Sequence, residues 1–347
     1  MSSFSLILLL LYVISVISLI ITRYIKMRLG NFIAILASLV AFIAAGSRPD
    51  NFPDVDTYEI IYDLSARGDF SDPDYWLFHG EPLFKILAYV LNYLGSNFKV
   101  FLLFMAFLSY YLLFIISKLS KIPFSYLWFA YFSFFFITRD LGVIRLSIAS
   151  HLIVIMLLKR KLIHQILIVS FSSFSFQYFS FLSLAAPLLS RFKLNTFRLS
   201  LLIVISLALS SLLSFEVIAS LMPEKQTISY SGVEMAEPTL IPIVRNFLFA
   251  GFIFFLFEKQ LHNSKLNTWV WAAFLSVILY ILTFNILIVS QRIGAYFGAI
   301  IPIALAYKMK RSQSPSELEF VSIAAICLLN FITVFYYNDF VWRYDLK

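Results

Sequence analysis

The sequence predicts an all-α protein that crosses a membrane about ten times. Of its 347 residues, 61% are hydrophobic and only 13% are charged, and the mean hydropathy is +0.88. Apolar runs comparable to the ~17–25 residues that cross a hydrocarbon core recur along the chain, separated by short clusters of Lys and Arg. These observations exclude an ordinary soluble domain, in which about a quarter of the residues are charged.

The expected elements follow from the apolar runs. One stretch, 162–190, is too long for a single untilted span, and its middle, 171–178, is rich in hydroxyl groups. It forms either one long tilted span or a re-entrant hairpin of two half-helices, which is allowed where the irregular backbone is buried in protein or lines a water-filled cavity. The ten other expected spans are 4–22, 30–46, 98–117, 122–138, 143–158, 199–221, 242–257, 268–289, 293–307 and 317–337.

The basic clusters favour the hairpin. Clusters of Lys and Arg mark the cytoplasmic face, and only the hairpin places every cluster on one side. A single span would move the clusters at 191–198 and 308–311 to the opposite face. We therefore predict a re-entrant hairpin. The six clusters are Arg23/Lys26/Arg28, Lys118/Lys121, Lys159/Arg160/Lys161, Arg191/Lys193/Arg198, Lys259/Lys265 and Lys308/Lys310/Arg311.

Two longer hydrophilic loops then face outwards, 47–97 and 222–241. The first holds nine of the 19 acidic residues and several Tyr and Trp, so amphipathic helices at the membrane interface are expected there. The whole chain, 1–347, is expected to form a single integral membrane domain.

Several arginines fall at or just inside the outer face, where a retained cation is costly and needs a reason. The planar guanidinium suits phosphate, because it donates two parallel hydrogen bonds. The alternative for Arg145 is a side chain that extends to the interface or pairs with Asp140. We expect Arg145 and Arg292 to face one outer cavity. The outer arginines are Arg48, Arg139, Arg145, Arg245 and Arg292.

Carboxylates in the first outer loop could act on hydroxyl groups. Asp54 and Asp56 lie two residues apart, and Glu81 precedes Pro82, which favours the first position of a helix. Such carboxylates could bind sugar hydroxyls or serve as a general base. The alternative is that they are solvated loop acids.

Metal, cofactor and nucleic-acid chemistry find no support. The four His and single Cys show no metal-ligand spacing, so neither a metal nor a cofactor is expected. The net charge of +8 is explained by the cytoplasmic clusters, so we expect no nucleic-acid partner.

Taken in order over roughly residues 40–300, these short motifs resemble the EpsG-type family of bacterial exopolysaccharide proteins, related in role to Wzy O-antigen and capsule polymerases. The family's Phe-His aligns with Phe176–Gln177, so Gln177 replaces the expected His but can still hydrogen-bond a sugar or phosphate. The other elements are Asp-x-x-x-Tyr at Asp54–Tyr58, Glu-Pro at Glu81–Pro82, Arg-x-x-x-Ala at Arg145–Ala149 and Arg-x-x-x-Tyr-Phe at Arg292–Phe297.

The resemblance implies a multi-pass inner-membrane glycosyltransferase whose site faces the periplasm, as would both outer loops. It would polymerise undecaprenyl-diphosphate-linked oligosaccharide repeat units of an O-antigen, capsule or exopolysaccharide. Its partners would be this lipid-linked substrate, membrane lipid, and a chain-length regulator and flippase. The expected catalytic groups are Arg145, Arg292, Glu81, Asp54 and Asp56, and the expected substrate-binding groups are Arg48, Arg139, Arg245, Tyr58, Gln177 and Tyr296.

Three other functions remain open on the sequence. A lipid-linked oligosaccharide flippase or other transporter predicts ionisable residues deep in several spans. An O-antigen ligase would use the same arginine and carboxylate chemistry. A non-catalytic assembly scaffold would leave the outer arginines dispensable.

Overall fold

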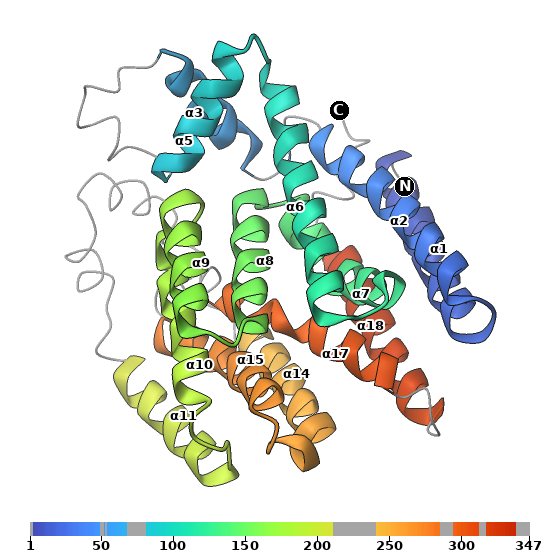
Figure 1. Ribbon diagram of the computed structural model, residues 1–347, viewed down its shortest axis with the longest axis vertical. Coiled ribbons are helices and arrows are strands. Elements are labelled where there is room, and N and C mark those ends of the chain that lie inside the picture. Colours follow the sequence, from blue (N-terminus) through green and yellow to red (C-terminus); the bar gives the residue numbers. More distant parts are fainter. Residues whose placement is uncertain are drawn as a thin grey trace. The chain divides into compact units, whose positions relative to one another are not determined.

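The computed structural model describes residues 3–48, 52, 54–67, 81–210, 241–284, 294–311 and 317–337, and every regular element among them is helical (Figure 1). The chain forms two compact units. The first comprises 1–66, 88–151 and 302–347, and the second comprises 67–87 and 152–301.

The first unit is built from long apolar helices. Its elements are α1 (Ser3–Tyr24), α2 (Met27–Gly46), α3 (Val55–Arg67), α6 (Phe98–Ser120), α7 (Phe124–Tyr131), the π-helix η1 (Phe132–Asp140), most of α17 (Ile300–Arg311) and α18 (Glu317–Tyr337). Helices α5 (Pro82–Tyr93) and α8 (Ile144–Leu158) are each divided between the two units.

Small side chains let α2 lie close to its neighbours. Helices α1 and α2 run side by side (Figure 1, blue), and the buried face of α2 is made mainly of Gly, Ala and Ser. At its end, a Cβ on Gly46 would lie 2.6 Å from the Cα of Leu103 in α6. Close backbone approach of this kind is how helices associate in a membrane, where apolar burial gives little driving force.

Among the described residues, five helices are long and apolar enough to cross a membrane: Phe4–Tyr24, Met27–Gly46, Phe98–Ser120, Ser264–Leu282 and Glu317–Tyr336. The protein is therefore a multi-pass membrane protein. Two of the other predicted spans are short in the described part. Helices α8 and α11 have 15 residues each, which extend about 22 Å against a core of about 30 Å.

The second unit contains the hydroxyl-rich stretch. Its elements are α9 (Leu162–Ser175), the 3-10 helix η2 (Tyr178–Leu184), α10 (Ala185–Leu189), α11 (Thr196–Ser210), α14 (Ile241–Phe257), the short 3-10 helix η3 (Glu258–Gln260), α15 (Ser264–Leu282) and a helical segment at 294–298.

The chain reverses direction within 162–190. The hydroxyl oxygens of Ser172 and Ser180 are 3.0 Å apart, whereas eight residues of straight helix would rise about 12 Å. Helix α9 ends and η2 packs back against it. The structure thus contains a helical hairpin with its break at Phe176 and Gln177, and its depth in a membrane stays a prediction.

The loop after the hairpin is fixed to the start of α15. The amide nitrogen of Asn267 donates to the carbonyls of Ser190 (2.8 Å) and Phe192 (3.2 Å). Trp271 Nε1 also donates to the Phe192 carbonyl, at 2.8 Å. The basic clusters at 191–198 and 259–265 therefore lie at the same end of the second unit.

Three basic clusters also meet at one end of the first unit. Lys310 Nζ donates to the carbonyl of Lys121, and Met27, beside the first cluster, lines the same cavity as these two lysines. Helix α2 extends from Met27 over 20 residues, or about 30 Å. Arg48, just beyond it, consequently lies at the opposite end from these clusters, as the topology prediction requires.

Candidate functional site

The first helix of the hydrophilic loop 47–97 presents the Tyr58 side chain to the interior. Helix α3 buries Tyr58 and Tyr62 and exposes Asp56, so it is amphipathic as predicted. The Tyr62 hydroxyl donates to the Ser96 carbonyl at 2.5 Å, which anchors the helix. Asp54 has a left-handed backbone (φ 63°), which Asp tolerates better than most residues, and its carbonyl accepts from the amide of Tyr58 at 3.0 Å.

Arg48 lies at the end of the π-helix. A π-helix is rare and often marks a functional site, and η1 ends at Asp140. Arg48 Nη1 donates to the Asp140 carbonyl at 2.6 Å, satisfying one of the carbonyls that a helix end leaves open. Arg48 is only 2% exposed, and its Nε and Nη2 have no hydrogen-bond partner among the described residues.

Electrostatics link Arg48 to the start of α3. Burial lowers the pKa of the Arg48 guanidinium, while electrostatic interactions with Tyr58, Asp140 and Asp54 oppose that shift. A guanidinium nevertheless stays charged in proteins. Arg48 is thus a buried cation, two of whose nitrogens have no hydrogen-bond acceptor among the described residues.

Arg145 converges on the same tyrosine. It is the second residue of α8, is 8% exposed, and places its guanidinium carbon 5.3 Å from the centre of the Tyr58 ring. Burial raises the pKa of the Tyr58 phenol, and the charges of Arg145 and Arg48 oppose the shift. Two arginines separated by almost one hundred residues in sequence therefore lie around one buried phenol.

A buried network supports this arrangement, and the sequence did not reveal it. The Asp140 carboxylate accepts hydrogen bonds from Ser109 (2.6 Å), Tyr131 (2.5 Å) and Ser147 (2.8 Å), which lie on three different helices. Ser109 also contacts His151 Nδ1 at 3.3 Å. The Asp140 carboxylate is thereby held by hydroxyl groups, while its carbonyl holds Arg48.

The second unit brings together two other predicted residues. Gln177, at the hairpin break, accepts a hydrogen bond from the Tyr296 hydroxyl at 3.0 Å, and both side chains are buried. Glu81 is buried as well, and helix α5 begins at Pro82 as predicted. The Glu81 carbonyl accepts from the amide of Lys85 at 3.2 Å, so Glu81 caps the first turn.

The other predicted residues make a different contact, are exposed, or lie outside the described part. Arg139 is partly exposed, and its guanidinium carbon is 5.5 Å from the centre of the Phe135 ring. Asp56 and Arg245 are exposed, on α3 and α14. Arg292 and the second outer loop lie outside the described residues, so the expected shared cavity of Arg145 and Arg292 stays a prediction.

The arrangement suits the recognition of an anion. Arg48 makes no ion pair with any described residue, although a buried charge without a partner is costly. A diphosphate would supply acceptors for its Nε and Nη2, and a two-nitrogen guanidinium edge matches that geometry. Within the described residues, no group of three His, Cys, Asp or Glu could hold a metal ion.

Fold and site together define a multi-pass helical membrane protein with buried arginines at one end of its first unit. The model of the EpsG family matches residues 31–346, and the chain belongs to this family. The EpsG family is a family of Wzy-like polysaccharide polymerases. Comparisons with curated proteins and with solved structures gave no match.

Proposed function

We propose that the protein polymerises undecaprenyl-diphosphate-linked oligosaccharide repeat units of an O-antigen, capsule or exopolysaccharide. The reaction takes place at the periplasmic face of the bacterial inner membrane. Family membership supports a polysaccharide polymerase. The separation of Arg48 from the basic clusters along α2 supports the choice of face.

In this reaction the bond between the donor sugar's anomeric carbon and the diphosphate oxygen breaks, and the acceptor hydroxyl oxygen bonds to that carbon. The electron pair leaves with undecaprenyl diphosphate, so negative charge grows on the phosphates. Donors positioned in advance for that charge lower the barrier without needing a metal. Arg48 and Arg145 take this role, with Arg292 as a further contributor proposed from its motif.

The proton of the acceptor hydroxyl goes to a carboxylate. Asp54 is the candidate in the first unit, because it is only partly buried and acts electrostatically on both Arg48 and Tyr58. Glu81 is the candidate in the second unit, where Gln177 and Tyr296 would contribute sugar-binding hydrogen bonds.

One observation carries this proposal. Arg48 is almost fully buried, yet two of its three nitrogens have no partner among the described residues. Among the described residues its hydrogen bond is to the Asp140 carbonyl, which suits a cation that awaits a ligand better than one held in a structural ion pair.

The proposal is tested by deleting the gene and restoring it with variants, followed by gel analysis of surface polysaccharide. Arg145→Ala and Arg48→Ala should leave a single repeat unit on the carrier lipid or lipid A core. Arg28→Ala, an exposed arginine near the other end of α2, should restore the full ladder.

The same gel separates the rival functions. Loss of all transferred glycan on deletion would indicate a ligase, and accumulation of repeat units in the cytoplasmic leaflet would indicate a flippase. Full-length polymer in both arginine variants would contradict the assigned roles and favour a scaffold.

A further inference from the structure

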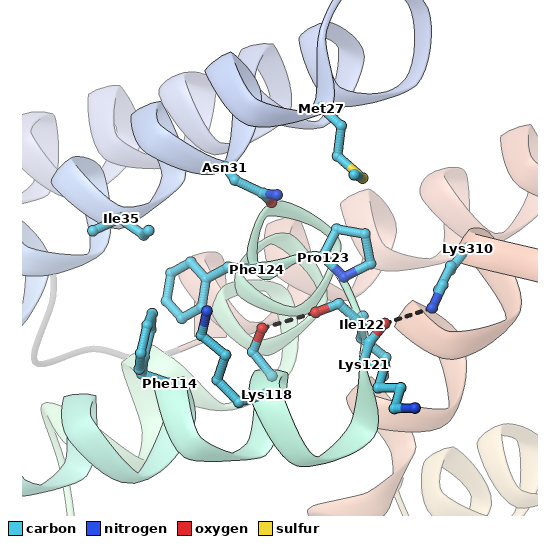
Figure 2. A pocket seen from close by; sticks show the side chains of 11 residues that line it. Met27, Asn31, Ile35, Phe114, Lys118, Lys121, Ile122, Pro123, Phe124 and Lys310 are labelled. Atoms are coloured by element: carbon cyan, nitrogen blue, oxygen red, sulfur yellow. Dashed lines mark hydrogen bonds between the residues drawn. The ribbon is translucent and has the colours of Figure 1, made fainter.

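The first unit has a cavity at the opposite end of α2 from Arg48. The cavity has a volume of about 360 Å³ and lies between the first turns of α2, the end of α6 and the start of α7 (Figure 2). Ile35, Phe114 and Phe124 contribute apolar walls, and the Asn31 side chain points into the space between the helices. It therefore offers apolar surface with a polar edge.

The charged residues that are described around the cavity are all basic. Lys118, Lys121 and Lys310 line it, and none of its described lining residues is acidic. Lys118 Nζ lies 5.1 Å from the centre of the Phe114 ring. Lys310 uses one of its three donors on the Lys121 carbonyl, which leaves two for another acceptor. Three lysines thus contribute to the lining of one small space.

The backbone at Lys121 adds a second argument. Lys121 ends α6 in the left-handed region, at φ 59°. Helices usually place glycine at such a position, because a side chain there costs about 1 kcal/mol or more. A lysine stands at this position, and its residue contributes to the cavity lining, despite that cost.

We propose that this cavity binds the phosphate headgroup of an anionic phospholipid. The ammonium groups would bind the phosphodiester, and the apolar walls would cover the glycerol and the first acyl carbons. Basic pockets between helices on the cytoplasmic side bind such headgroups, and three basic clusters meet at this end of the unit. The cavity volume is also within the range of about 300–1,000 Å³ for small-ligand sites. This inference does not rest on the proposed polymerase activity.

The test uses the full-length protein purified in detergent and titrated with phosphatidylglycerol, with retained lipid counted by native mass spectrometry. Lys121→Gly is the sharpest variant, because glycine suits the left-handed turn and keeps the carbonyl that Lys310 binds. This single substitution should weaken phosphatidylglycerol binding about five-fold. Replacing all three lysines that line the cavity should weaken it about a hundred-fold.

A matched control removes equal charge elsewhere. The control replaces three basic residues of another cluster by alanine: Lys159, Arg160 and Lys161. This change should leave phosphatidylglycerol binding unchanged. An equal loss in this control would overturn the proposal, because binding would then follow net charge. Equal retention of phosphatidylcholine would overturn it too. So would displacement of the lipid by inorganic phosphate at matched concentration, which would indicate a small-anion site.

Discussion

Replacing Arg48 with methionine asks whether its guanidinium serves the fold or a ligand, because methionine fills irregular space with an apolar chain. The change removes the 2.6 Å bond to the Asp140 carbonyl, worth about 1.5–3 kcal/mol for a charged donor. It also removes buried Nε and Nη2, which lack described partners and cost about 1–3 kcal/mol each. These contributions oppose each other, so the free energy of unfolding should change by an amount between a loss of about 1 kcal/mol and a gain of about 4.5 kcal/mol.

Polymer synthesis should respond far more strongly than stability. Loss of one donor positioned for a developing negative charge typically costs about 10²–10³-fold in rate. We expect Arg48→Met to lose at least about 100-fold in polymerisation rate, with Arg48→Lys intermediate because lysine keeps the charge but not the planar fork.

The assay pairs two measurements on one preparation. The unfolding temperature is measured in detergent micelles, and polymer formation is measured with a purified lipid-linked repeat unit. Arg28→Met is the control and should change neither quantity. The reasoning is refuted if Arg48→Met unfolds the protein, or if the folded variant polymerises at the normal rate.

Three further predictions concern other described contacts. Asp140→Asn should lower the free energy of unfolding by about 1–3 kcal/mol, because an amide cannot accept from all three hydroxyl donors; an unchanged unfolding temperature would contradict this network. Gln177→His should retain a hydrogen bond to Tyr296 and most of the polymerising activity. Gln177→Leu should lower the free energy of unfolding by about 1 kcal/mol and lose more activity. If both variants behave alike in the unfolding and polymer assays, the contact does not have this role. Gly46→Ala should cost about 1–3 kcal/mol through overpacking against Leu103. Gly251→Ala is the control, because a Cβ there meets nothing within 4 Å, and it should instead stabilise α14 by up to about 1 kcal/mol. An equal fall in the unfolding temperatures of the Gly46 and Gly251 variants would refute the packing argument.

Much of the site in the first unit could be predicted because cations near a membrane face need a physical reason. The cost of such cations predicts Arg48 and Arg145, and the Asp-x-x-x-Tyr pattern in loop 47–97 predicts Asp54 and Tyr58. The structure brings all four together. The reversal in 162–190 was predicted from charge balance, which depends on topology and not on local propensity.

The Asp140 network could not be predicted. Ser109 and Ser147 are ordinary residues for apolar helices, and they approach Asp140 only through tertiary packing. The π-helix has only nine residues, which is too short for a hydrophobic period to distinguish it from an α-helix. The predicted start of a helix was also wrong where its first turn is polar, because only the apolar part was recognised as helix. Helix α15, for example, begins at Ser264 because Asn263 caps it.

The central claim is that Arg48 and Arg145 bind the diphosphate, and equilibrium binding of undecaprenyl diphosphate measures this most directly. Binding can be followed through the phosphorus resonance of the ligand in detergent micelles. The account predicts that Arg48→Met and Arg145→Met each weaken binding by roughly 100-fold, whereas Arg28→Met leaves it unchanged. Binding as tight in both variants as in the unaltered protein would contradict the account.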